Sequence, residues 1–384
     1  MRNTTYLLLA TTVAAFLPAQ NQAFQFTTGG GGAIEVPYDP AMLPPTGITI
    51  EAWITYDDAS IPTGLFYWPT IARQNIQPQL ESWNFRIGAS NTGNRSLEFI
   101  MRGPTGGLNV LNYLFAPGEF AQFTHLAATY DGQTMTLYKN GVQIATRTLP
   151  TSGDIPNNGG ILRIGNGDAS FPGVETWNGL IDELRIWPMP RSAAEITESM
   201  NQTLMSMPGK VITFNADGVY ADSSRGLLGT PVGTTGFAAG APGLNMVMPN
   251  ALNLGTSTTT CARTIDAALG GAPTVGNSSF TIWCTKGPLP ASSALGLVVA
   301  AGQAAPTGQP PLIGVQLAFS LASVLSTSAF VPGTTGRGLQ KITLAIPNSP
   351  IYLGTGFVFQ FGFADAQCGP LGFTGSDGVA FTIQ

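Results

Sequence analysis

The sequence predicts an all-β protein with two β-sandwich bodies behind an N-terminal signal peptide. Short runs of alternating apolar and polar residues recur along the chain and are separated by turn residues, as expected for strands joined by hairpins. The 384 residues include 48 glycines and 29 prolines, and only 10% are charged. That composition is typical of strand-and-turn proteins and not of helix bundles. Charged residues become sparser near residue 250, which marks a boundary between the two bodies.

Residues 1–23 have the features of a signal peptide. Arg2 precedes a largely apolar run over residues 6–17, and Pro18 interrupts that run. The run is too short to cross a bilayer, and cleavage is expected after Ala19 or Ala23. No later run reaches the length of a transmembrane helix. We therefore expect an exported protein, extracellular or in the cell envelope, without a transmembrane segment.

Alternation predicts the strands of the first body. The pairs Asp131-Gly132 and Asn140-Gly141 separate three of the runs and are strong hairpin signals, because Asp, Asn and Gly tolerate positive φ. A short helix is expected over residues 192–200, with Ser192 as N-cap and Glu195 at the capping-box position. The expected strands are residues 33–37, 48–54, 84–87, 97–101, 124–130, 134–139, 142–148, 161–164 and 179–187.

The expected strand 179–187 carries an acidic residue in an apolar pattern. Strict alternation places Leu180, Asp182, Leu184 and Ile186 on one face, which should point into a core. A carboxylate there is costly unless it is hydrogen-bonded, paired or bound to a metal. Its neighbour Glu183 should point to the opposite face.

Residues 24–202 resemble the laminin-G-like modules of the concanavalin A-like lectin/glucanase superfamily. The matching motifs occur in the family's order and are Ile50-Glu-Ala-Trp53, Phe123-Thr-His-Leu-Ala-Ala-Thr-Tyr-Asp-Gly132, Leu137-Tyr-Lys-Asn-Gly141, Gly179-Leu-Ile-Asp-Glu-Leu-Arg-Ile-Trp187 and Arg191-Ser-Ala-Ala-Glu-Ile196. The resemblance implies that the first body is a jelly roll. Residues 203–249 are similar to the tail or linker that often follows such modules.

Residues 250–384 are expected to form the second, smaller β-sandwich. Strands are predicted at residues 280–284, 295–299, 339–346, 357–363 and 379–383. This part is similar to a C-terminal domain appended to many exported bacterial proteins, and that resemblance implies no activity.

The three cysteines all lie in this last part of the chain. In an exported protein we expect one disulfide, either Cys261–Cys368 or Cys261–Cys284. Zinc is not expected, because there is no Cys-x-x-Cys pair and the single histidine, His125, is far away in sequence. His125 is expected to be a structural residue of a strand.

Calcium is the candidate cofactor, since the resemblance implies an ion at the edge or rim of the sandwich in many relatives. One candidate set is Asp182 with carbonyl groups around Gly30, and the other is Asn166 and Asp168 with Asp154. The alternatives stay open: Asp182 accepts hydrogen bonds from backbone amides, and residues 166–168 form an ordinary turn.

Aromatic residues suggest a ligand surface. Phe66, Tyr67 and Trp68 lie in a predicted loop, and Trp177 precedes the last strand. Flat rings stack on sugars, so Tyr67, Trp68 and Trp177 are candidate ligand contacts. The alternative is that these rings plug the ends of the sandwich.

These patterns favour a non-catalytic binding or adhesion protein that recognises a glycan or an extracellular protein. A formal net charge of −5 argues against nucleic acid as a partner. The Glu-x-Asp-x-(x)-Glu arrangement of the sandwich hydrolases is absent, and the neighbours Asp182 and Glu183 are expected on opposite faces. Two alternatives remain, a structural envelope protein without a ligand and a glycan-degrading enzyme. The oligomeric state is open.

Overall fold

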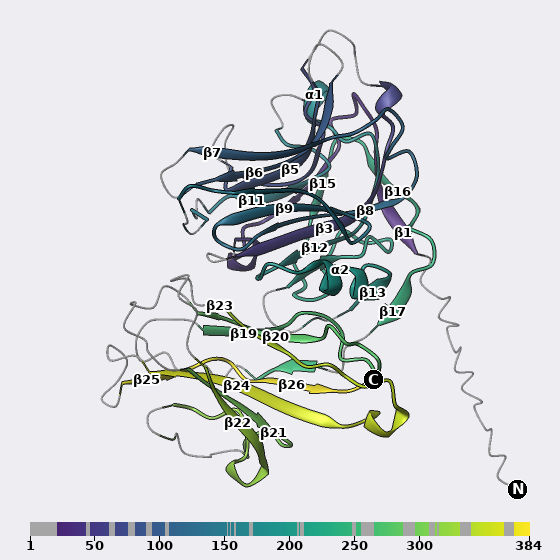
Figure 1. The fold of residues 1–384 in the computed structure, drawn as a ribbon. Helices are drawn as coiled ribbons and strands as arrows, with labels where there is room; N and C mark the ends of the chain where they lie inside the picture. The colour runs from purple at the N-terminus through teal and green to yellow at the C-terminus, as the bar shows by residue number, and fades with distance from the viewer. Residues whose placement is uncertain are drawn as a thin grey trace, which may run out of the picture.

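The computed structural model describes two β bodies, one above the other in Figure 1. Within the described residues, no helix is both long and apolar enough for a membrane span. The description covers residues 21–384 apart from 44–46, 61–65, 76–80, 90–93, 104–106, 152, 154, 157–158, 169–171, 206, 208–210, 248–250, 255–264, 287–295, 307–311, 313–314, 331–338 and 365–371.

The first body is a sandwich of an eight-stranded and a seven-stranded sheet. The eight-stranded sheet runs in the order β10 (Val142–Thr148), β9 (Thr134–Lys139), β8 (Thr124–Tyr130), β3 (Ile48–Tyr56), β12 (Gly179–Trp187), β1 (Gln22–Phe26) and β16 (Thr235–Ala239), with β14 (Ile212–Phe214) paired to β12. The seven-stranded sheet runs in the order β15 (Thr230–Val232), β2 (Ala33–Val36), β11 (Ile161–Ile164), β4 (Thr70–Asn75), β5 (Trp83–Ala89), β6 (Arg95–Arg102) and β7 (Leu108–Leu114).

The inner faces of the two sheets form one hydrophobic core. Ile50, Ile54, Phe85, Phe99 and Leu137 are among its fully buried members. The predicted hairpins β8–β9 and β9–β10 are present, with positive φ at Gly132, Asn140 and Gly141. The all-β prediction is therefore confirmed.

Residues 203–249 are more than a linker. Within this segment β14 pairs with β12, β15 with β2 and β16 with β1, so that both sheets are extended. A separate pair, β13 (Gln202–Leu204) and β17 (Asn245–Val247), is parallel. The sheets of the first sandwich consequently run on to Ala239.

Strand β12 does not alternate strictly. Its pairing with β3 shifts between Asp182 and Arg185, and Glu183 has a φ of 49°. This bulge places Ile181, Leu184 and Ile186 in the core. Asp182 pairs with Trp53 and lies on the side of the sheet away from this core, where it is still fully buried, so the prediction of a core-facing Asp182 is wrong.

The second body has a six-stranded and a three-stranded sheet. The six-stranded sheet runs in the order β18 (Ala251–Asn253), β26 (Val379–Thr382), β24 (Gly356–Ala364), β21 (Gly296–Ala301) and β22 (Val324–Phe330), with β25 (Phe373–Gly375) paired to β24. The three-stranded sheet runs in the order β19 (Ile265–Leu269), β20 (Thr281–Lys286) and β23 (Leu339–Thr343). Five helices of three or four residues are also described: α1 (Pro172–Glu175), η1 (Pro40–Met42), η2 (Asp58–Ser60), η3 (Leu321–Ser323) and η4 (Pro350–Tyr352).

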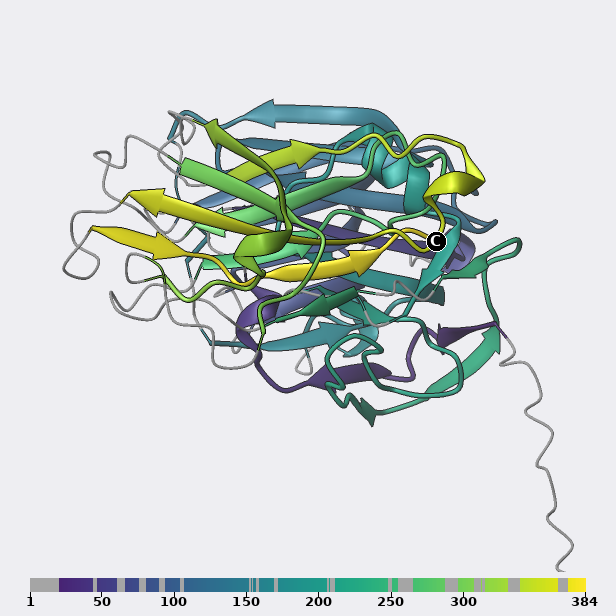
Figure 2. The same cartoon turned by 90° about the horizontal axis from the view of Figure 1, so that it is seen from below.

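Helix α2 (Ala193–Ser199) lies between the two bodies (Figure 1), and Figure 2 shows the molecule from below. Its predicted capping box between Ser192 and Glu195 is present. Glu195 also accepts hydrogen bonds from Thr281 (2.5 Å) and Trp283 (3.2 Å) of the second body, and Lys341 pairs with it at 2.8 Å. Glu195 thus caps the N-terminus of α2 and also forms part of the contact between the two bodies.

The two bodies also share a hydrophobic cluster. Trp187 and Met189 at the end of β12 belong to the same cluster as Ile282 and Phe361 of the second body. Burial of these side chains stabilises both bodies at once. The second body is therefore packed against the first and is not a tethered independent unit.

Candidate functional site

Both carboxylate oxygens of Asp182 accept backbone N–H groups. Glu183 donates to Oδ1 and Ala241 donates to Oδ2, each at 2.8 Å. Burial raises the pKa of Asp182 to about 8, and the nearby Glu183 carboxylate adds to that rise. This arrangement matches the alternative in which Asp182 accepts hydrogen bonds from backbone amides. The two amides belong to its neighbour in β12 and to a residue that follows β16, and not to the turn around Gly30.

Gly30 is not a neighbour of Asp182. The Gly30 carbonyl accepts the amide of Thr234, just before β16, whereas Asp182 contacts Ala241, just after it. Five residues of strand, or about 17 Å, separate the two places. The expected pairing of Asp182 with Gly30 is therefore corrected.

The rim set of Asn166, Asp168 and Asp154 divides in the structure. Asn166 is fully buried and donates to Thr176 Oγ1 at 2.9 Å, while its own Oδ1 accepts the Asp168 amide at 2.9 Å. Asp154 lies outside the described residues. Across the described part of the chain, no group of three His, Cys, Asp or Glu side chains could hold a metal.

Two of the three candidate aromatic contacts are core residues. Tyr67 and Trp177 are fully buried, and the Trp177 Nε1–H donates to the Thr55 carbonyl at 3.0 Å. Trp177 also packs on Tyr56, with ring centroids 4.6 Å apart. Neither ring can stack on a ligand. The prediction that Tyr67 and Trp177 contact a ligand is therefore corrected in favour of the alternative, in which these rings plug the ends of the sandwich.

Trp68 keeps an exposed surface. Its ring stacks with Phe66 at a centroid distance of 5.9 Å and an interplanar angle of 12°, and Phe66 is 55% exposed. The Arg86 guanidinium lies 5.7 Å from the Trp68 ring and pairs with Glu98 at 2.9 Å. We call these four residues the Trp68 surface.

The Trp68 surface opens onto the outer face of the seven-stranded sheet. Along β5, Trp83, Phe85 and Ile87 enter the core, so Asn84 and Arg86 project from the other side. Register places Arg73 beside Asn84 and Glu98 beside Arg86. Charged and polar residues from three neighbouring strands therefore meet on this face.

Ion pairs continue the face beyond Asn84. Arg73 pairs with Glu81 at 3.4 Å and with Glu175 of α1 at 3.2 Å. Arg163 pairs with Glu35 at 2.8 Å. Burial raises the pKa of Glu175. Arg73 acts in the opposite direction, and the neighbouring carboxylates Asp168 and Glu81 raise the pKa further.

Asn84 is fully buried, and neither its amide nitrogen nor its amide oxygen has a hydrogen-bond partner. An unsatisfied buried polar group costs about 1–3 kcal/mol. A leucine at this position would avoid this cost. Packing alone therefore does not explain why the strand carries an asparagine here.

Sequence reasoning missed Asn84, Arg86 and Glu98. Asn84-Phe-Arg-Ile was recognised as a strand, and its alternation shows which residues leave the core. What alternation does not show is that β4 and β6 flank β5. That adjacency comes from the sheet order.

Asp182 and Glu183 lie on the same side of their sheet because of the bulge. Glu183 pairs with Arg185 at 2.8 Å, and Arg191 pairs with Glu51 at 2.8 Å. The prediction of opposite faces is therefore wrong. All five residues are at most 2% exposed, so this cluster is sealed against a substrate.

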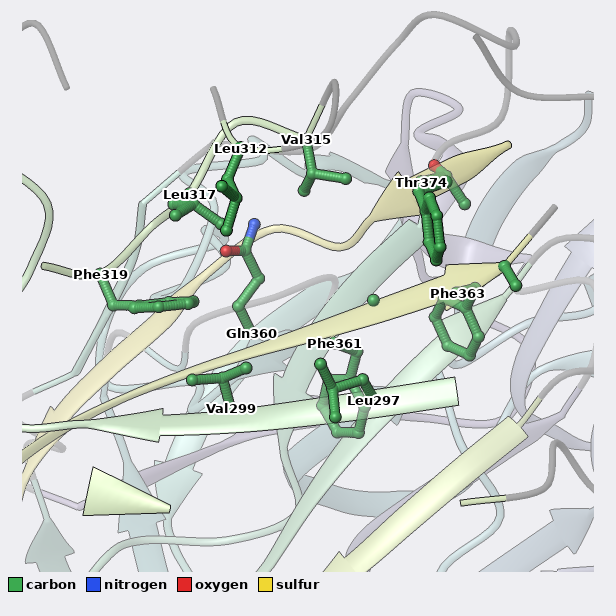
Figure 3. A pocket seen from close by; sticks show the side chains of 13 residues that line it. Leu297, Val299, Leu312, Val315, Leu317, Phe319, Gln360, Phe361, Phe363 and Thr374 are labelled. Atoms are coloured by element: carbon green, nitrogen blue, oxygen red, sulfur yellow. The ribbon is translucent and has the colours of Figure 1, made fainter. Parts of the chain in front are cut away.

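A separate apolar recess of about 200 Å³ lies on the second body (Figure 3). Leu297, Leu317, Phe319 and Phe363 line it. The Gln360 amide also reaches it, but Gln316, Ser376 and Ala318 satisfy that amide through their backbones.

Cys284 of β20 is buried in the core of the second body. Cys261 and Cys368 lie outside the described residues, and the choice between the two disulfide pairings stays a prediction.

Residues 28–197 match the family model of the concanavalin A-like lectin/glucanases superfamily. The two-sheet sandwich and this match make the first body a laminin-G-like module of that superfamily.

Mouse pappalysin-1 is 24% identical over 176 residues, which are 43% of this chain and 10% of that protein. The chain thus spans about a tenth of the length of this relative. Among solved structures, a protein from Bacteroides ovatus described as a candidate carbohydrate binding protein is similar at 18% identity, with a TM-score of 0.43 over 59% of this chain and 61% of its own. A heptameric pentraxin from Limulus polyphemus is similar at 12% identity, with a TM-score of 0.40 over 58% of this chain and 97% of its own.

Proposed function

We propose that this protein is an exported, non-catalytic binding protein whose first body holds a glycan on the Trp68 surface. The observation that carries the proposal is the partly exposed Phe66–Trp68 stack beside the Arg86–Glu98 pair. A sugar ring packs its C–H face on an aromatic ring, while a guanidinium and a carboxylate bond its hydroxyl groups. The membership of the first body in a lectin-containing superfamily supports the same reading.

The environment of the carboxylates supports a role without catalysis. Glycoside hydrolysis needs two carboxyl groups facing one cleft that a sugar can enter. Asp182 and Glu183 are sealed inside, and Arg73 holds both Glu81 and Glu175 on a buried part of the outer face. None of these pairs lies in an open cleft.

A glycan array followed by titration with the strongest binders tests the proposal. Trp68→Ala removes the stacking ring and should weaken binding by about tenfold or more, because such contacts contribute about 1.5 kcal/mol or more. Tyr352→Ala is the matched control, since Tyr352 is an exposed aromatic residue of the second body. Equal loss in both variants, or no binding by the wild-type protein, would refute the proposal.

A further inference from the structure

The outer face of the seven-stranded sheet carries about as many negative as positive side chains. In the part that the structure describes, it carries as many glutamates as arginines: Glu35, Glu81, Glu98 and Glu175 against Arg73, Arg86, Arg102 and Arg163. Asp168 adds a further carboxylate at its margin, close enough to influence Arg163 and Glu175. The face therefore has no surplus of positive charge.

The cation nearest to the exposed rings is already paired. Arg86 reaches both Trp68 and Glu98, and its distance to the Glu98 carboxylate is 2.9 Å. A sugar carboxylate or sulfate at this place would have to displace Glu98 or lie beside it. Either event costs free energy, because like charges repel and a broken pair leaves a charge without its partner.

Neutral hydroxyl groups fit the Arg86–Glu98 pair better than anionic groups do. A hydroxyl group donates one hydrogen bond and accepts others, so it can bond the Arg86 N–H groups and the Glu98 oxygens without separating them. Asn84 lies on the same face of β5, two residues from Arg86, but its amide is fully buried and does not meet the ligand. The polar groups around the rings are thus suited to an uncharged, hydroxyl-rich ligand.

We propose that the ligand of the Trp68 surface is a neutral glycan and that the Arg86–Glu98 pair discriminates against acidic sugars. This inference rests on the proposed function and specifies its substrate class. It also implies that salt has little effect on affinity, because no net charge is neutralised on binding.

The test compares neutral oligosaccharides with their sialylated, uronate-containing or sulfated counterparts at low and high salt. The neutral form should bind at least about tenfold more tightly, and its affinity should change less than about twofold between 50 and 500 mM salt. Tighter binding of acidic forms, weakened by salt, would overturn the inference while leaving glycan binding in place. An absence of binding to any glycan would overturn the proposed function as well.

A substitution that keeps the size of the side chain but removes its charge separates discrimination from folding. Glu98→Gln removes the carboxylate that repels an acidic sugar, so the ratio of neutral to acidic affinity should fall by about fivefold or more. Glu119→Gln is the matched control, because Glu119 is also paired, with Lys139 at 2.7 Å, and the two glutamate side chains are 17% and 16% exposed. An unchanged ratio in Glu98→Gln, or the same fall in both variants, would contradict the role assigned to Glu98.

Discussion

His125 shows how one side chain takes its properties from its surroundings. It is almost completely buried, its ring meets Trp53 edge-on, and its Nε2 lies 3.9 Å from Glu51. Burial lowers the pKa of His125 from 6.5 to about 4, against the raising effect of Glu51. The folded protein therefore holds the imidazole neutral.

This lowered pKa predicts a pH dependence of stability. Below pH 6.5, His125 binds a proton in the unfolded chain but not in the folded chain. The free energy of unfolding therefore falls as the pH falls from about 6.5 to about 4. The loss amounts to about 3 kcal/mol at most. Urea unfolding of wild type and His125→Gln across this range measures it: the difference between the two free energies should change with pH. A constant difference would show that folding leaves the pKa of His125 unchanged.

Asp182 is the second residue whose role can be measured. Asp182→Ala leaves the amides of Glu183 and Ala241 without their acceptor, so the free energy of unfolding should fall by about 1–3 kcal/mol. If these amides are its only partners, a chelator should leave the wild-type melting temperature unchanged. A lower melting temperature in chelator, absent in Asp182→Ala, would instead establish a stabilising cation at this residue.

At the scale of elements, strand β1 constrains where the signal peptide can be cut. Gln22 pairs with Ala239 of β16, its amide donates to Asp217 at 3.1 Å, and Ala23 is fully buried. Cleavage after Ala23 would remove the start of this strand. We therefore predict, for an exported chain, cleavage after Ala19 and a mature N-terminus at Gln20, which intact mass measurement of the secreted protein can read directly. A mature chain beginning at Phe24 would contradict this prediction.

Elements also differ in how well local sequence predicts them. The β8–β9–β10 meander and helix α2 follow from Asp-Gly, Asn-Gly and capping-box signals, which act over a few residues. The bulge in β12 carries no such signal, because Glu183 is an ordinary residue for a strand and its φ of 49° is imposed by the pairing with β3. One inserted residue changes which side chains face the core.

At the scale of the whole molecule, the two bodies should unfold together. They share a hydrophobic cluster around Trp187 and Met189, and Glu195 receives three groups from the second body. Calorimetry should therefore show one transition. Lys341→Ala should lower its temperature more than Lys139→Ala, because Lys341 bonds the almost fully buried Glu195 whereas Lys139 pairs with the more exposed Glu119. Two separate transitions would show that the contact contributes little to stability.

The sequence by itself determined the fold class, the hairpins, the capped helix and the laminin-G-like motifs. Each is local or follows a fixed periodicity, so a short stretch contains all the information. Only the tertiary structure decided that Tyr67 and Trp177 are core residues while Trp68 stays partly exposed, and that residues 203–249 extend both sheets. It also assembled Trp68, Arg86 and Glu98 into one surface. The physical reason is that burial and adjacency depend on which strands pair, and pairing is fixed by contacts between residues far apart in the chain.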